Sequence, residues 1–155
     1  MNQPGNWRAA VSAGFVAGIL ATAVEIVLWS IFTDALPEIL FRDARFAAAI
    51  AMGPGVLVPS ASVDWGAMVV ATLVHFTLSV AYALILGRLI GGLSLFPSLL
   101  AGAAFGLGLF AVNMYGFTHF FPWFEAARDW ITAATHVAFG AVAAAAYGVL
   151  AKRPK

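Results

Sequence analysis

Four polar residues stand out in this sequence because each lies inside a long apolar segment. They are Glu25, His75, Asn113 and His136, and Glu25 is the only acid away from the ends of these segments. A carboxylate in apolar surroundings costs several kcal/mol unless it is paired, ligated or protonated. Carboxylate and imidazole groups on facing helices also bind metal ions and relay protons. Which chemistry is available depends on whether the fold brings the four side chains together.

The composition is that of a membrane protein. The chain has 155 residues, of which 63% are hydrophobic and 10% are charged, whereas soluble domains carry about 25% charged residues. Its mean hydropathy is +0.94. The absence of cysteine excludes disulfide and thiolate chemistry, and a net charge of +1 gives no basic face for nucleic acid. The first apolar run has no typical cleavage site and is expected to be retained as an anchor.

Four segments are long and apolar enough to cross a bilayer, which takes about 20 residues. They cover about 9–32, 65–90, 95–118 and 126–150, and they are separated by breaks rich in Pro and Gly. The sequence therefore predicts an all-α bundle of four transmembrane helices, forming a single integral membrane domain over 1–155. Lysine and arginine favour the cytoplasmic side. Five of them lie on the side of the termini and three on the other, which predicts that both termini lie in the cytoplasm.

The two halves of the chain share a pattern. Residues 13–25 read AGFVAGILATAVE and residues 101–113 read AGAAFGLGLFAVN, with five identities in thirteen positions. His75 and His136 follow at matching places, and an Arg-Asp pair precedes each of these two histidine-bearing segments. This pattern predicts two repeated helical hairpins of one orientation, about 9–90 and 95–150. The first has an extra stretch, which predicts an outer-surface or re-entrant helical segment at about 35–51.

Depth in the bilayer places the four polar residues in one layer. At 1.5 Å per residue, Glu25 and Asn113 lie about 24–27 Å from the cytoplasmic ends of their helices, and the two histidines about 15 Å from the outer ends. Gly14 and Gly18 share a stripe with Glu25, as Gly102 and Gly106 do with Asn113. Small residues in membrane helices mark close packing. The polar side chains are therefore expected to point into the bundle.

The first reading of this layer is a binding site for a metal ion or haem. A metal such as iron, copper or zinc would be bound by Glu25, His75 and His136, with His119 as an outlying candidate. Alternatively, His75 and His136 would be the axial ligands of haem b. The residues expected to support the ligands are Asn113, Ser79, Tyr82 and Tyr147.

Two other readings stay open. The layer could translocate an ion, a proton or a small solute, with Thr22, Tyr82 and Tyr147 extending a polar path. Alternatively, Glu25 contacts a histidine to fix helix register in a structural or accessory subunit without a cofactor. The glycine stripes suggest a homo-oligomer or a subunit of a membrane complex, besides the lipid bilayer itself. The aromatic residues between Phe117 and Phe124 are expected to form an interface belt. Soluble-enzyme motifs are absent, so an enzymatic role is left open.

Three stretches carry a resemblance to a known family. They read LFRDARFAAAIAMGPGVL, LVHFTLSVAYALILGRLI and FPWFEAARDWITAATHVAFG. They resemble a family of small uncharacterised four-span proteobacterial inner-membrane proteins, some of which carry the label "sodium:proline symporter". The resemblance implies an inner-membrane location and no established activity. True symporters of that class have far more than four spans and a discontinuous first helix, and this sequence shows neither feature.

Overall fold

The computed structural model describes residues 6–58 and 63–151, and within these ranges the chain is helical and has no strand. The long helices are α1 (Trp7–Phe32), α3 (Trp65–Ile90), α4 (Leu95–Ala111) and α5 (Trp130–Ala151). A π-helix, η2 (Val112–Gly116), and a 3-10 turn, η3 (Phe117–His119), continue α4. The four resulting segments are long and apolar enough to cross a membrane. The predicted all-helical fold with four spans is confirmed.

Side-chain caps explain where three of the spanning helices begin. The carboxamide of Asn6 accepts from the Ala9 N–H at 3.2 Å, and the carboxylate of Asp64 accepts from the Ala67 N–H at 2.9 Å. The carboxylate of Asp129 accepts from the Thr132 N–H at 2.8 Å. Such caps satisfy amide groups that have no partner inside the helix. The last span therefore begins at 130 and not near 126, because 122–127 form a separate 3-10 helix, η4 (Pro122–Ala127).

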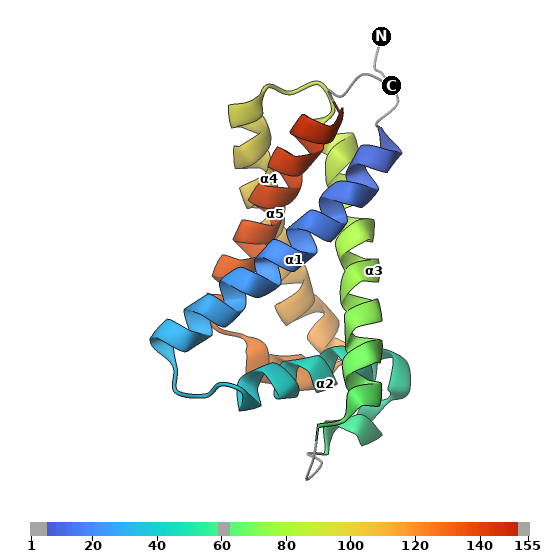
Figure 1. Ribbon diagram of the computed structural model, residues 1–155, viewed down its shortest axis with the longest axis vertical. Helices are drawn as coiled ribbons and strands as arrows, with labels where there is room; N and C mark the ends of the chain where they lie inside the picture. Colours follow the sequence, from blue (N-terminus) through green and yellow to red (C-terminus); the bar gives the residue numbers. More distant parts are fainter. Residues whose placement is uncertain (1–5, 59–62, 152–155) are drawn as a thin grey trace.

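A shorter helix lies across the end of the bundle opposite the chain termini (Figure 1). This is α2 (Glu38–Met52), which overlaps the stretch 35–51; that this stretch is an outer-surface or re-entrant segment stays a prediction. It ends at Gly53, whose φ of 82° favours glycine, and the 3-10 turn η1 (Pro54–Leu57) follows. The indole N–H of Trp123 in η4 donates to the Phe46 carbonyl at 3.1 Å. α2 and η4 together form the end of the molecule that we call the α2 end.

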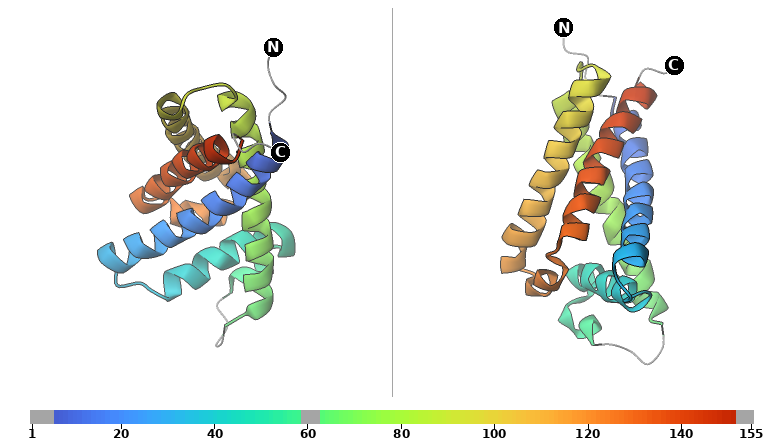
Figure 2. Two further views of the ribbon diagram at one scale, coloured as in Figure 1. Left: turned by 45° about the horizontal axis from the view of Figure 1, so that its top comes forward. Right: turned by 90° about the vertical axis from the view of Figure 1, so that its left-hand side faces the viewer.

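The spanning helices pack in the order α3, α1, α5 and α4 (Figure 2). Glycines allow two pairs of helices to bring their backbones close together. A Cβ on Gly14 of α1 would lie 2.7 Å from Cα of Val80 in α3, and one on Gly106 of α4 would lie 3.0 Å from Cα of Val137 in α5. Both predicted glycine stripes therefore face helices of the same chain. They give no argument for a partner chain, and the homo-oligomer stays a prediction.

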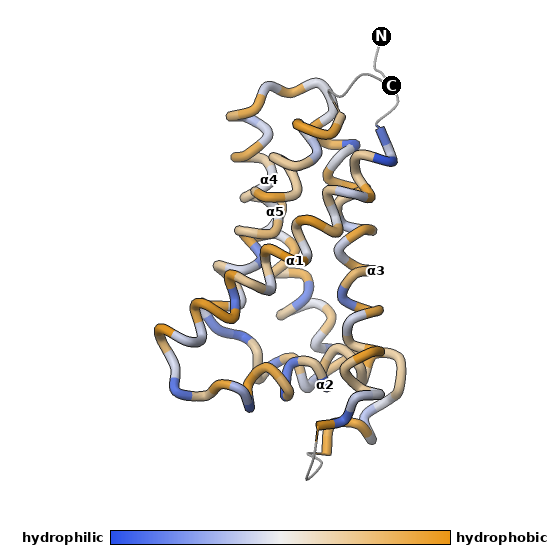
Figure 3. The backbone as a smooth tube through the Cα atoms, viewed as in Figure 1, coloured by the Kyte–Doolittle hydropathy of each residue, from blue (hydrophilic) through white to orange (hydrophobic). Residues whose placement is uncertain are grey.

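Small residues fill the half of the bundle that carries the termini. Ala13, Ala17 and Ala144 are completely buried there, and Leu86 and Ile90 of α3 close the same core. Figure 3 shows mostly hydrophobic spanning helices, with hydrophilic positions around α2 and its neighbouring loops and at the start of α1. The polar features of the fold therefore lie toward the α2 end, while the termini end is a tightly packed apolar core.

Candidate functional site

The four polar residues singled out in the sequence line one cavity of about 400 Å³. Glu25 comes from α1, His75 from α3, Asn113 from η2 and His136 from α5, and α2 contributes Asp43, Ala47 and Ile50 to the wall. The structure thus brings the four side chains together, one from each span. A volume of this size falls within the range of roughly 300–1,000 Å³ that is typical of small-molecule sites.

A chain of hydrogen bonds joins three of the helical segments at this cavity. The Nδ1 atom of His136 lies 2.8 Å from the carbonyl of Thr132, and because a carbonyl only accepts, Nδ1 carries the proton. His136 Nε2 then accepts from the Asn113 amide at 3.2 Å, and the Asn113 side-chain oxygen accepts from the Tyr82 hydroxyl at 3.0 Å. Every donor in this chain meets an acceptor, so His136 is held in one orientation.

His75 is held by a different partner helix. Its Nε2 lies 3.3 Å from the carbonyl of Gly18 and 3.5 Å from the hydroxyl of Thr22, both in α1. The carbonyl requires that Nε2 donates, which leaves Nδ1 as the unprotonated nitrogen of the ring. His75 therefore bonds to α1, the span that precedes its own helix in the chain. His136 bonds to its own helix and to η2, which belongs to the span before it.

The two acids of the cavity differ in their surroundings. The carboxylate of Asp43 is 2.7 Å from Nε of Arg42. Burial raises the pKa of Asp43 above its usual 3.8 and Asp129 adds to this rise, while the hydrogen bond and charge of Arg42 oppose it. Glu25 is half-buried, and among the described residues nothing donates a hydrogen bond to it or forms an ion pair with it. Glu25 is thus the acid of the cavity without a protein partner.

Several lining residues were missed by reasoning from the sequence. Asp43 was read only as half of an Arg-Asp pair. Thr135 is 7% exposed, lines the cavity, and its hydroxyl has no hydrogen-bond partner among the described residues. The rings of Phe117, Phe121 and Phe124 also line the cavity, although they were predicted to form an interface belt. For Thr135, the sequence feature that could have indicated a place in the cavity wall is its position directly before His136.

Two predicted site residues lie outside the cavity. His119 is exposed in η3. Tyr147 belongs to the core of the termini end, where its ring would be 3.0 Å from a Cβ on Gly87. Ser79 does line the cavity and is 5% exposed. Tyr147 is displaced from the layer because it follows His136 by three helical turns toward the termini.

Of the predicted metal ligands, Glu25, His75 and His136 line the same cavity but do not converge. Among the described residues, no group of three or more His, Asp or Glu side chains is placed to hold a metal ion. The reason lies in the partners of the histidines, because His75 turns toward Gly18 and His136 toward Asn113. Axial ligation of haem through Nε2 would break both of these hydrogen bonds. The residues therefore do not fit either group without rearrangement of their side chains.

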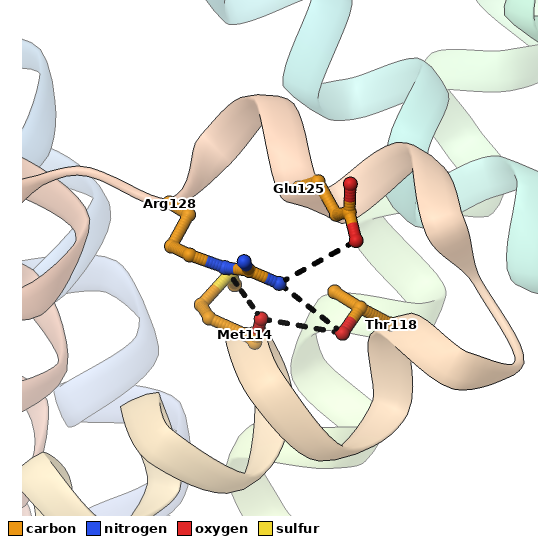
Figure 4. A network of polar contacts seen from close by, with 4 residues as sticks. All are labelled: Met114, Thr118, Glu125 and Arg128. Atoms are coloured by element: carbon orange, nitrogen blue, oxygen red, sulfur yellow. Dashed lines mark hydrogen bonds and ion pairs between the residues drawn. The ribbon is translucent and has the colours of Figure 1, made fainter.

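An arginine outside the cavity holds the segment that carries Asn113 (Figure 4). Nε of Arg128 donates to the carbonyl of Met114 at 2.9 Å, and its Nη2 lies 3.4 Å from the Thr118 hydroxyl. The guanidinium carbon also lies 4.2 Å from the centre of the Tyr115 ring, a cation–π arrangement. Carbonyl groups at the end of a helix lack partners within the helix. Arg128 supplies a donor to one of them, the carbonyl of Met114, which directly follows Asn113.

No protein-family model, curated protein or solved structure matches the chain. The site itself therefore carries the functional argument.

Proposed function

We propose that the protein binds a small amphipathic molecule in the cavity between its four spanning helices. The observation that carries this proposal is a cavity of about 400 Å³ with mainly apolar walls, into which all four spans present a polar residue. Ligand sites combine an apolar lining with a few placed polar groups that fix orientation. Glu25, Thr135 and the His136–Asn113–Tyr82 chain are those groups here.

Binding is favoured over passage through the membrane because the cavity is closed on one side. Leu109 and Phe139 line it on the side of the termini, and the alanine-rich core of the termini end lies beyond them. Translocation of an ion, proton or solute would require that this core opens. The distribution of lysine and arginine supports an orientation with both termini in the cytoplasm and the cavity in the outer half of the bilayer.

We also propose that the two hairpins are repeats. The second glycine of each stripe packs against the histidine of its own hairpin. A Cβ on Gly18 would be 3.1 Å from Nε2 of His75, and one on Gly106 would be 2.8 Å from the carbonyl carbon of His136. The histidines then occupy matching places on the two sides of one site.

A metal site at Glu25, His75 and His136 is the second candidate. It is favoured by the geometry of His136, because an imidazole that donates Nδ1–H to a carbonyl is oriented to offer Nε2 to a metal. The metal site ranks second because the Asn113 amide already donates to Nε2 of His136. Among the described residues, Glu25 also forms no hydrogen bond with either histidine. Elemental analysis and a visible spectrum of protein purified in mild detergent test it, with stoichiometric metal or a Soret band as the result that would reverse the order.

Binding of the neutral fluorescent probe N-phenyl-1-naphthylamine to protein in lipid nanodiscs tests the cavity. Leu78 lines the cavity, whereas Leu73 on the same helix does not and is 63% exposed. We expect saturable binding that Leu78→Trp weakens at least tenfold, because the larger ring fills the site, and that Leu73→Trp leaves unchanged. Binding that does not exceed that of empty nanodiscs, or equal effects of the two variants, would refute the proposal.

A further inference from the structure

We infer that the ligand of the cavity is an organic cation, with a protonated amine on an apolar body. This inference rests on the proposed function of the cavity and names the chemical class of its ligand. Its first support is charge. Glu25 and Asp43 line the cavity, and no Lys or Arg is among the described residues that line it.

The two acids are unequal, and the difference points to Glu25 as the partner of the cation. Asp43 already has Arg42 at 2.7 Å, and Asp129 caps α5 through its bond to the Thr132 N–H. A bound cation would give the Glu25 carboxylate the opposite charge that the described residues do not supply, whereas an anion would lie beside the two acids that line the cavity.

A second observation, independent of the acids, also points to a ligand with a polar group. The Thr135 hydroxyl is buried at the cavity wall and has no hydrogen-bond partner among the described residues. A buried polar atom without a partner destabilises the folded protein. An N–H group of a bound amine would satisfy it.

The walls favour an organic cation over a bare metal ion or proton. The rings of Phe117, Phe121, Phe124 and Phe139 surround the acids with apolar surface. Aromatic faces attract ammonium groups, most strongly where water is excluded. A bare ion would use Glu25 and leave this apolar wall without a partner, whereas an apolar body with a cationic head uses both.

Three probes of matched shape separate charge from hydrophobicity. They are the protonated amine benzylammonium, its uncharged carbon isostere ethylbenzene, and the anion phenylacetate. Each is titrated against N-phenyl-1-naphthylamine bound to the full chain in nanodiscs, with empty nanodiscs as background. We expect the cation to displace the fluorescent probe at a concentration at least tenfold below that of the other two.

Variants then assign the preference to Glu25. We expect Glu25→Gln to reduce the preference for the cation to threefold or less and Glu25→Asp to keep most of it. Glu38→Gln removes an exposed acid from α2 and is the control for general surface charge. Equal displacement by the three probes, or a preference that survives Glu25→Gln, would overturn the inference. Absence of saturable binding of the fluorescent probe would instead refute the proposed function.

Discussion

Close contact between α4 and α5 predicts that Gly106→Ala is strongly destabilising. The added Cβ would lie 2.8 Å from the carbonyl carbon of His136 and 3.0 Å from Cα of Val137, both of them backbone atoms. Carbon atoms in contact are normally about 3.5–4.0 Å apart, so the two helices must separate by roughly 1 Å. Overpacking of this kind costs about 1–3 kcal/mol and sometimes more.

Gly108→Ala is the matched control two residues further along the same helix. A Cβ there meets nothing within 4 Å. Both variants gain the roughly 0.5–1 kcal/mol by which alanine exceeds glycine in a helix, so the difference between them isolates the overpacking cost. We expect Gly106→Ala to be less stable than Gly108→Ala by about 1–3 kcal/mol, measured by reversible unfolding in mixed micelles. Equal stability of the two variants would refute the backbone contact between α4 and α5.

Three further predictions concern polar groups around the cavity. Burial raises the pKa of Asp43 above 3.8, so the folded state binds this proton more tightly than the unfolded state. The contribution of Asp43 to stability should then rise as the pH falls from its folded pKa toward 3.8, and Asp43→Asn should flatten the measured pH dependence. Arg128→Lys loses the donor to the Met114 carbonyl and should lower the free energy of unfolding by about 1–2 kcal/mol, with faster hydrogen exchange in η2. Tyr82→Phe removes the donor to Asn113 and should cost about 1 kcal/mol in the same unfolding assay; an unchanged stability would argue against that bond.

Hydropathy and residue spacing predicted the parts of this structure that depend on single helices. The four spans follow from apolar length, and the shared level of Glu25, Asn113 and the two histidines follows from counting residues along straight helices. The facing of Gly14 and Gly106 toward neighbouring helices follows from the same periodicity. These features need no knowledge of which helix is next to which.

The partners of the polar residues could not be predicted, because they depend on tertiary packing and on local breaks in helix geometry. The two Arg-Asp pairs look alike in the sequence, yet Arg42 binds the neighbouring Asp43 while Arg128 binds the carbonyl of Met114. That carbonyl is available because α4 continues as a π-helix, for which the sequence has no clear signal. The segment 117–124 folds back toward α2 as 3-10 turns, so its rings reach the cavity without a regular period.

The packing of the termini end has a mechanical consequence. Alanine and glycine side chains have no rotamers to exchange, so α1 and α5 near Ala13 and Ala144 can move only as a joined block. At the α2 end, α3 and α4 are held apart by the cavity and connected mainly through other segments. A small tilt of the helices at the stiff termini end would therefore become a larger displacement at the α2 end, where the cavity lies.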